Sequence, residues 1–270
     1  MASAVRFAEF DQRRSTLIMQ MLVRKTDWSA NFCAPVGLNT GETLAFMRSS
    51  TLIADLDQEQ CVKIASAALA RQLCRDDFLF LQGHPVRNVT VLRSGCVKLI
   101  RVSPNGHEAL VRVSGVGGVV NFGGSSSLCH ACSARVTETG EALVWDYSRL
   151  QILFASYPKL QDNFNRELVS QLADLEQRYR EIATEKVEAR LALLLLRLRK
   201  QIGKRTDRGV QVSLRREELA QMTGATLFTI SRFLSRWAQE GLILSRREAV
   251  IIVDPYRLNS VHCRRAKPPC

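Results

Sequence analysis

Residues 214–254, LRREELAQMTGATLFTISRFLSRWAQEGLILSRREAVIIVD, decide how the C-terminal third of the chain folds. A short helix is expected to begin near Arg215, with apolar residues along one side: Leu219, Ala220 and Met222. Gly224 can end that helix in a left-handed conformation, and Thr226 suits the N-cap of a second helix. Apolar residues recur at helical spacing in this second helix: Ile230, Phe233, Leu234 and Trp237.

Two short helices joined by a glycine-containing turn are the arrangement that places a second helix in the major groove of DNA. The residues that the second helix leaves exposed can donate hydrogen bonds to phosphates and base edges: Thr226, Thr229, Ser231, Arg232 and Arg236. Residues 242–244 and 250–253 flank a turn that contains Arg246 and Arg247, which predicts a two-stranded wing. The alternative is two core-packed helices and a hairpin with no nucleic-acid partner.

The net charge of the chain is +12, and most of it lies in the same third as this motif. Residues 184–270 contain 18 Lys and Arg against 8 Asp and Glu, a net of +10, whereas residues 1–183 contain 20 against 18, a net of +2. A basic segment attached to a nearly neutral remainder is typical of a domain that binds a polyanion. This distribution therefore indicates double-stranded DNA as a partner.

The composition indicates a soluble protein, with 46% hydrophobic and 24% charged residues. No run of about 18 apolar residues occurs, so no membrane span is expected, and the first 30 residues lack the apolar block of a secretory signal. Eight cysteines are scattered along the chain, which favours reduced thiols. We expect a cytoplasmic protein without a membrane partner.

The pattern of apolar residues changes twice along the chain. Residues 44–73 are helical in pattern, whereas short alternating runs punctuated by glycines follow from Phe78 and predict an antiparallel barrel or sandwich. The helical period returns after Pro158, with apolar residues at steps of three and four: Phe164, Leu168, Leu172, Leu175, Tyr179 and Ile182. Such a seam is most simply buried against its own copy in a homodimer. The alternative is that it packs against the barrel.

Five segments follow from these changes. They are an N-terminal arm (1–44), a β-barrel sensor domain (45–157), a dimerisation helix (158–183), a winged helix-turn-helix domain (184–258) and a basic tail (259–270). The expected fold class is therefore α+β.

The order of these segments resembles the Crp/Fnr family of bacterial transcription regulators over residues 45–258. The motifs that carry the resemblance are Glu218-Leu219-Ala220, Gly224, Thr229-Ile230-Ser231-Arg232, Glu240-Gly241-Leu242-Ile243, Phe80-x-x-Gly83 and Leu92-x-Ser94-Gly95-x-Val97-Lys98-Leu99. The resemblance implies a jelly-roll barrel like that of cyclic-nucleotide-binding domains, a homodimer on a palindromic operator, and RNA polymerase as a further partner. It implies a regulator and not an enzyme.

By the same resemblance, the recognition helix spans about residues 226–237. Arg232 matches the family arginine that reads a guanine, and Ser231 matches the serine beside it in the Fnr branch. Phe228 stands where the family usually has Glu, so this chain is expected to prefer a different half-site. The expected DNA-contacting residues are Arg215, Thr226, Leu227, Phe228, Thr229, Ser231, Arg232, Arg236, Arg246 and Arg247.

The residues that hold a cyclic nucleotide in the family are not matched here. Aligning the phosphate-binding segment to residues 117–136 puts Phe122 at the family's Glu and Cys132-Ser133 at its Arg-Ser pair. The hydroxyl pair that contacts the purine falls at Leu175-Glu176. Because a cyclic phosphate would lose its charge-assisted partner, we expect that cyclic AMP is not the ligand.

Cys129, His130 and Cys132 lie where that segment would be and are the sensor candidates. Three interpretations remain open: ordinary thiols, a redox dithiol, or part of a metal site that Cys33, Cys96 or His107 would have to complete. Arg135 nearby would favour a reactive thiolate. The cofactor and any metal therefore stay undetermined.

Two other functional classes remain as alternatives. The first is a thiol- or metal-dependent redox protein, and the second is an adaptor that has lost DNA binding. Retention of Ser231, Arg232 and the basic charge argues against the adaptor.

Overall fold

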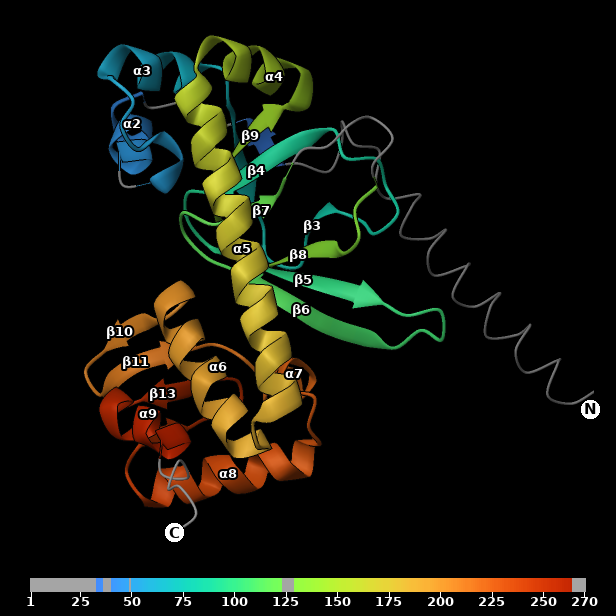
Figure 1. The fold of residues 1–270 in the computed structure, drawn as a ribbon, viewed down its shortest axis with the longest axis vertical. Coiled ribbons are helices and arrows are strands. Elements are labelled where there is room, and N and C mark those ends of the chain that lie inside the picture. The colour runs from blue at the N-terminus through green and yellow to red at the C-terminus, as the bar shows by residue number, and fades with distance from the viewer. Residues whose placement is uncertain (1–32, 36–39, 49, 123–128, 264–270) are drawn as a thin grey trace, which may run out of the picture.

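The computed structural model describes residues 33–35, 40–48, 50–122 and 129–263. It shows a sensor domain and a C-terminal domain joined along one long helix, α5 (Figure 1). Most of the predicted arm and the end of the basic tail lie outside the described residues. None of the described helices is long and apolar enough to cross a membrane.

The sensor domain consists of two antiparallel sheets. One has the strand order β1-β2-β9-β4-β7, and the other has the order β3-β8-β5-β6. Their bounds are β1 (Cys33–Pro35), β2 (Leu69–Leu73), β3 (Phe78–Phe80), β4 (Asn88–Leu92), β5 (Cys96–Val102), β6 (Glu108–Ser114), β7 (Val119–Asn121), β8 (Ser133–Glu138) and β9 (Gly140–Asp146). The fold is jelly-roll-like, as predicted, but its strands form two sheets and not one closed barrel.

The start of the sensor domain differs from the helical pattern predicted for residues 44–73. Helix α2 (Thr40–Arg48), a short 3-10 helix (Thr51–Ile53) and α3 (Gln58–Ser66) are helical. Asp57 and Gln60 form a capping box that begins α3. Leu69–Leu73 instead pairs with β9 as strand β2, because pairing in the sheet overrides the local helical spacing.

Helix α4 (Tyr147–Ser156) leads into α5 (Pro158–Thr184), whose first position is a proline. At 27 residues, α5 is about 40 Å long by the usual rise per residue. Its inner face is fixed to the sensor domain, since Asn163 donates to Leu52 O and Arg178 donates to Val111 O. At its C-terminal end, the buried carboxylate of Glu181 accepts two hydrogen bonds from Arg197 of α6 (Val187–Gln201), at 2.6 and 2.9 Å.

The C-terminal domain contains the predicted two-helix motif and wing. Beyond α6, its elements are β10 (Lys204–Thr206), β11 (Gly209–Val212), α7 (Arg216–Thr223), α8 (Leu227–Gln239), β12 (Ile243–Ser245), β13 (Val250–Ile252) and α9 (Pro255–Cys263). Strands β12 and β13 pair as predicted, and β10 and β11 extend them into a four-stranded sheet. Gly224 ends α7 with φ 62° and ψ 40°, the left-handed conformation that glycine adopts without strain.

One apolar core joins the two domains. Cys96, Leu110 and Val113 of the sensor sheet belong to the same buried cluster as Leu219 and Trp237 of the C-terminal domain. The two domains therefore pack directly on each other as well as through α5.

Candidate nucleic-acid interface

Helix α8 is amphipathic and carries an exposed surface on the side away from the core. Ile230, Leu234 and Trp237 are buried, so they fix which side of the helix faces solvent. The hydroxyl of Thr226 accepts from the backbone N–H of Thr229 at 3.2 Å and caps the helix as predicted. Phe228, in the first turn, has 76% of its surface exposed, so a large apolar side chain stands free where the helix would enter a groove.

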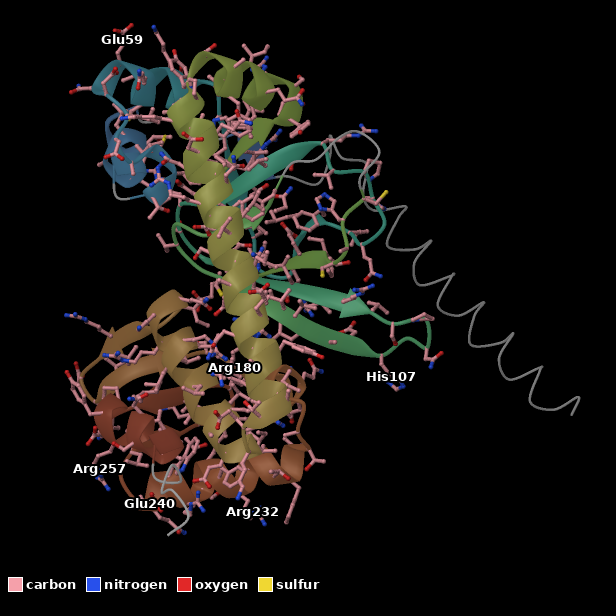
Figure 2. The ribbon with its side chains drawn as sticks, viewed as in Figure 1. Glu59, His107, Arg180, Arg232, Glu240 and Arg257 are labelled. Carbon is pink, nitrogen blue, oxygen red and sulfur yellow. The ribbon has the colours of Figure 1, made fainter. Side chains whose placement is uncertain are left out.

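The two arginines of α8 differ in their surroundings. The guanidinium carbons of Arg232 and Arg236 lie 5.4 and 5.3 Å from the centre of the Phe233 ring, which holds both by cation–π contacts. Arg236 also pairs with Glu188 and lies 3.7 Å from Glu240. Among the described residues, Arg232 has no salt-bridge partner, and it is exposed on the outer surface of the domain (Figure 2). Arg232 is therefore the arginine whose donors are open to a base.

Arg216 is a functional candidate that the sequence analysis missed. Its guanidinium donates to Ser231 Oγ at 3.4 Å and to Ser245 Oγ at 3.1 Å, so it ties α7 to the recognition helix and to the wing. The sequence analysis names its neighbour Arg215, the N-cap residue of α7, as a DNA-contacting residue. Sequence spacing alone did not separate two adjacent arginines at the boundary of a helix.

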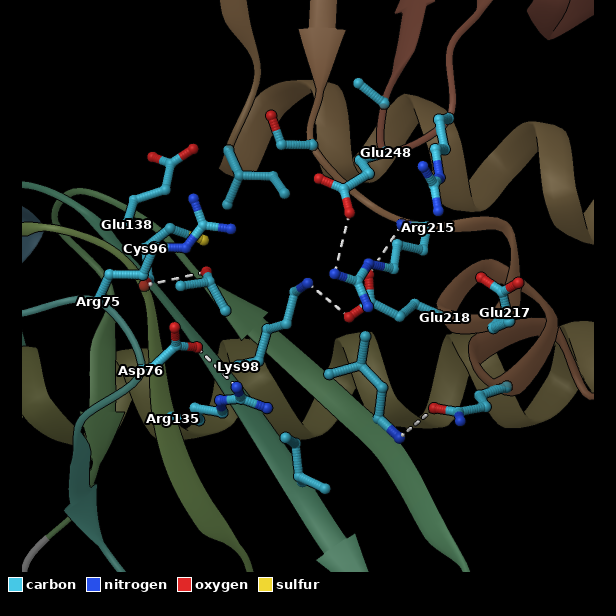
Figure 3. A pocket seen from close by; sticks show the side chains of 18 of the residues that line it. Arg75, Asp76, Cys96, Lys98, Arg135, Glu138, Arg215, Glu217, Glu218 and Glu248 are labelled. Carbon is cyan, nitrogen blue, oxygen red and sulfur yellow. Dashed lines mark hydrogen bonds and ion pairs between the residues drawn. The ribbon is translucent and has the colours of Figure 1, made fainter.

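Arg215 lies instead in a cleft between the domains. Its guanidinium pairs with Glu248 of the wing turn at 2.9 Å, and its backbone N–H donates to Glu218 (Figure 3). Arg246 and Arg247 are exposed on the same turn and line the wing side of this cleft. The wing arginines thus border both the outer surface and the cleft.

The cleft has a volume of about 880 Å³ and is lined by side chains of both charges. Lys98 of β5 reaches across it to Glu218 of α7 at 2.5 Å, while Arg135 pairs with Asp76 on the sensor side (Figure 3). Gln221 accepts from the backbone N–H of Leu110 at 3.1 Å. These contacts hold α7, and with it α8, against the sensor strands β5 and β6.

The three sensor candidates differ in their burial and surroundings. His130 is buried and stacks on Phe80 with 3.7 Å between ring centres, and its Nε2 has no hydrogen-bond partner among the residues that the structure describes. Burial lowers its pKa to about 4, with a further contribution from His84. Burial also raises the pKa of the Cys132 thiol, against the opposing effect of Arg101 and Arg112. The expectation of a thiolate favoured by Arg135 is therefore wrong for Cys132.

No metal site is formed by the part of the chain that the structure describes, since no group of three or more His, Cys, Asp or Glu side chains is suitably placed. Cys129 is exposed and Cys132 is partly buried, and both are free thiols. Cys129 forms an isolated β-bridge with Pro85. Within the described residues 129–138 there is no helix, the element whose start activates the thiol of a dithiol oxidoreductase.

The predicted seam on α5 is exposed except at its first residue. Leu168, Leu172, Leu175 and Ile182 are exposed, as is Tyr179. Phe164 is only 7% exposed, because it packs against Phe122 and Phe154 in the core of the sensor domain. Phe164 therefore packs into its own sensor domain at the edge of the exposed face of α5, and its predicted place in the seam stays a prediction.

Comparisons with known proteins identify the family. The model of the Crp-like helix-turn-helix domain matches residues 189–261, and the model of the cyclic nucleotide-binding domain matches residues 70–157. The chain belongs to the Crp/Fnr family of transcription regulators. It is a DNA-binding regulator and not an enzyme.

Several Crp/Fnr proteins are similar over most of the chain. Electron transport regulator A of Shewanella oneidensis is 26% identical over 183 residues, 67% of this chain and 73% of that protein. The CRP-like cAMP-activated global transcriptional regulator of Mycobacterium tuberculosis is 29% identical over 213 residues, 75% of this chain and 92% of that protein. The structure of FixK2 from Bradyrhizobium japonicum has the same fold, with a TM-score of 0.62 and 18% identity, covering 72% of this chain and 96% of that one.

The structure describes Phe122, Leu175 and Glu176, three of the residues that the resemblance aligns with nucleotide-binding positions. Phe122 packs edge-on against Phe164 with 6.3 Å between ring centres, and Leu175 and Glu176 are exposed on α5. A guanidinium is present nearby, but it comes from Arg112 of β6. Arg112 donates to the carbonyl of Val120 at 2.6 Å and to Gln171 of α5, and burial lowers its pKa. Arg112 therefore connects β6 to α5.

Proposed function

We propose that the chain acts as a homodimer that recognises a palindromic operator through α8 and does not respond to cyclic AMP. The single observation that carries this proposal is the form of α8. One face is buried by Ile230, Leu234 and Trp237, while Phe228 and Arg232 stand free on the other. A helix of this form can enter the major groove with its N-terminal turns against base edges.

Each exposed residue has a distinct proposed role. Arg232 donates two parallel hydrogen bonds to a guanine, with Ser231 beside it. Phe228 contacts a thymine methyl group, which a phenyl ring can do and a carboxylate cannot. Thr226, Leu227 and Thr229 complete the first turn of the reading surface.

The remaining arginines are proposed to contact phosphates. Arg216 is added to Arg215 in this role, because Arg216 lies beside Ser231 of α8 and Ser245 of the wing. Arg246 and Arg247 contact the backbone from the wing. Arg236 is paired with Glu188, so it contributes to DNA binding only if a phosphate takes the place of that carboxylate.

The homodimer is proposed to form along α5. Five apolar side chains are exposed at alternating steps of four and three residues, which is the seam of a two-stranded coiled coil: Leu168, Leu172, Leu175, Tyr179 and Ile182. A two-fold axis along this seam would place two copies of α8 on one side of the dimer, as a palindromic operator requires. By family resemblance, the dimer works in the cytoplasm together with RNA polymerase.

The insensitivity to cyclic AMP follows from the replaced side chains. The Mycobacterium tuberculosis relative is described as cAMP-activated, whereas this chain has Phe122 and Cys132 where the Glu and Arg of a phosphate-binding segment would be. Without the arginine, the cyclic phosphate would lose a charge-assisted hydrogen bond worth about 1.5–3 kcal/mol.

Selection of bound sequences from a random DNA pool tests this function. We expect a two-fold symmetric site with half-sites about one helical turn apart, and an affinity that cyclic AMP leaves unchanged. Sedimentation of Leu175→Asp should show a monomer, because the change would bury an unpaired charge in the seam. An asymmetric selected site, or an operator affinity that rises with cyclic AMP, would contradict the proposal.

A further inference from the structure

A cavity of about 430 Å³ lies beside the N-terminal half of α5, at the end of the sensor domain remote from α8. Its walls come from β4, α4 and α5 and from Phe122, which follows β7. The apolar lining residues are Val89, Phe122, Leu150, Phe154, Ala155, Phe164 and Leu168, and the polar ones are Tyr147, Gln151, Gln161 and Asn165. Phe164 forms the floor, with the edges of Phe122 and Phe154 packed against it. In the isolated chain this apolar wall would face water, which is unfavourable in proportion to its area.

The cavity is continuous with the seam of α5, since Leu168 belongs to both. The exposed residues of the seam define a heptad in which Leu172 and Tyr179 occupy a positions and Leu168, Leu175 and Ile182 occupy d positions. Continuing the repeat towards the N-terminus places Asn165, which also lines the cavity, at an a position. The interface that buries the seam therefore extends over the mouth of the cavity.

The direction of pairing follows from the position of the C-terminal domain. Helix α5 runs from the sensor domain to the C-terminal domain (Figure 1). Only a parallel pair of α5 helices puts both copies of α8 at the same end, where one operator can contact them. In a parallel coiled coil, a g residue of one helix lies beside the e residue of the partner that is five positions further along.

That rule pairs a residue of the cavity with an exposed residue of the second copy. Phe164 occupies a g position, and the e position five residues on is Val169. Val169 is 66% exposed in the single chain. A β-branched apolar side chain is thus free at the place where a parallel partner would meet Phe164.

We propose that the partner's Val169 closes this cavity against Phe164, so that a second copy of the chain completes the core of each sensor domain. This inference rests on the homodimer proposed above and specifies one of its contacts. By symmetry, the contact is made twice in each dimer. Asn165 meets its counterpart across the axis, and a polar pair at an a position fixes the register that keeps Val169 opposite Phe164.

The test is a mutant cycle on the dimer dissociation constant, measured by sedimentation. Val169→Ala should weaken dimerisation about tenfold or more, since two methyl groups are lost at each of two sites. Alanine is the better helix former, so a weaker dimer would not come from a frayed α5. The matched control is Val116→Ala, which changes a valine of similar exposure, 62%, in the turn between β6 and β7.

Combination with Phe164→Leu shows whether the two side chains touch. If they do, the double variant should weaken the dimer by less than the product of the two single effects. Additive effects would overturn the contact. Phe164→Leu could disturb the sensor core, because Phe164 is buried. Val169 is exposed in the single chain, so Val169→Ala leaves that core intact and tests the contact by itself.

The remaining outcomes separate this inference from the proposed function. A wild-type chain that stays monomeric at all concentrations overturns the homodimer itself. If the wild type dimerises and Val169→Ala behaves like Val116→Ala, only the contact is overturned.

Binding of benzene, measured by saturation-transfer NMR, is a second test. Benzene should bind the Leu175→Asp monomer and not the wild-type dimer. Equal binding to both would show that the cavity stays open to a small apolar ligand.

Discussion

Lys98 Nζ on strand β5 lies 2.5 Å from Glu218 Oε1 on α7, and these side chains are only 12% and 21% exposed. The same carboxylate accepts the backbone N–H of Arg215 through Oε2, at 2.8 Å. One carboxylate therefore caps the first helix of the DNA-binding motif and anchors it to the sensor sheet. A displacement of β5 has a direct route to α8 that does not pass through α5.

Lys98→Met should loosen this contact between the domains. Glu218 would still accept the backbone N–H of Arg215 and cap α7. It would lose its cationic partner in a largely buried place, and this loss should lower stability by about 1–3 kcal/mol. We expect faster hydrogen exchange of the backbone in β5 and α7, while exchange within α8 changes less. Lys63→Met, at an exposed ion pair with Glu59, is the control. Unchanged exchange in α7 would show that the apolar contacts alone hold the domains together.

Arg232→Ala should lower affinity for the selected operator by about 1–3 kcal/mol and relax the preference at one base pair of each half-site. Binding to random duplex should fall much less, because non-specific attraction comes from the total positive charge. Arg205→Ala removes an exposed arginine of β10, away from α8, and serves as the control. Equal losses on operator and random duplex would mean that Arg232 contacts only phosphates.

Glu181→Gln should destabilise the junction between α5 and α6 by about 3 kcal/mol. The change leaves Arg197 without the carboxylate that accepts both of its hydrogen bonds in a buried place. Urea unfolding at a fixed protein concentration measures the effect. The control is Glu185→Gln. The carboxylate of Glu185 lies 3.8 Å from the exposed Arg180, so this change should lower the free energy of unfolding by little. A loss no larger than that of the control would argue against the pair as a structural element.

His130 should make the stability of the sensor domain dependent on pH. Burial lowers its pKa to about 4 in the folded chain, against about 6.5 in an unfolded one. The unfolded state therefore binds the proton more readily between these values, and stability falls as the pH drops from 6.5 to 4, by about 3 kcal/mol in total. His130→Phe keeps the stack on Phe80 and should remove this part of the dependence. The same dependence in His130→Phe and in the control His107→Gln would exclude His130 as its source.

Cys129 should react with iodoacetamide near neutral pH much faster than Cys132. The Cys129 thiol is exposed, whereas burial raises the pKa of Cys132 and leaves little of the reactive thiolate. Mass spectrometry of the two sites over time measures both rates. If operator affinity shifts on oxidation in the wild type and in Cys132→Ser but not in Cys129→Ser, the exposed thiol alone is the sensor. A faster reaction at Cys132 would contradict the burial of its thiol.

The two helices of the DNA-binding motif could be predicted from the sequence. The period of Ile230, Leu234 and Trp237 identified α8, and the turn residues Gly224 and Thr226 behaved as predicted, because these signals act over a few neighbouring positions. The apolar spacing predicts helix for Leu69–Leu73, which is a strand because it pairs with β9.

The candidate site was less accessible to sequence reasoning, because its decisive contacts join distant residues. Arg215 and Arg216 are neighbours in the chain, yet one pairs with Glu248 in the cleft and the other bonds Ser231 and Ser245. The burial of Phe164 depends on Phe122 and Phe154, which lie well before it in the sequence. Such partners have no local pattern, so a periodicity argument does not separate them.

The fixing of α5 at both ends bears on how chimeric regulators should be built from this chain. Asn163 and Arg178 bind α5 to the sensor domain, and Glu181 binds it to α6. A fusion joined before Pro158 would sever the first two contacts, and one joined at Thr184 would sever the third. A donor of new DNA specificity should therefore be grafted beyond Gln201, with α6 kept from this chain, or should bring its own counterpart of Glu181 together with that of Arg197.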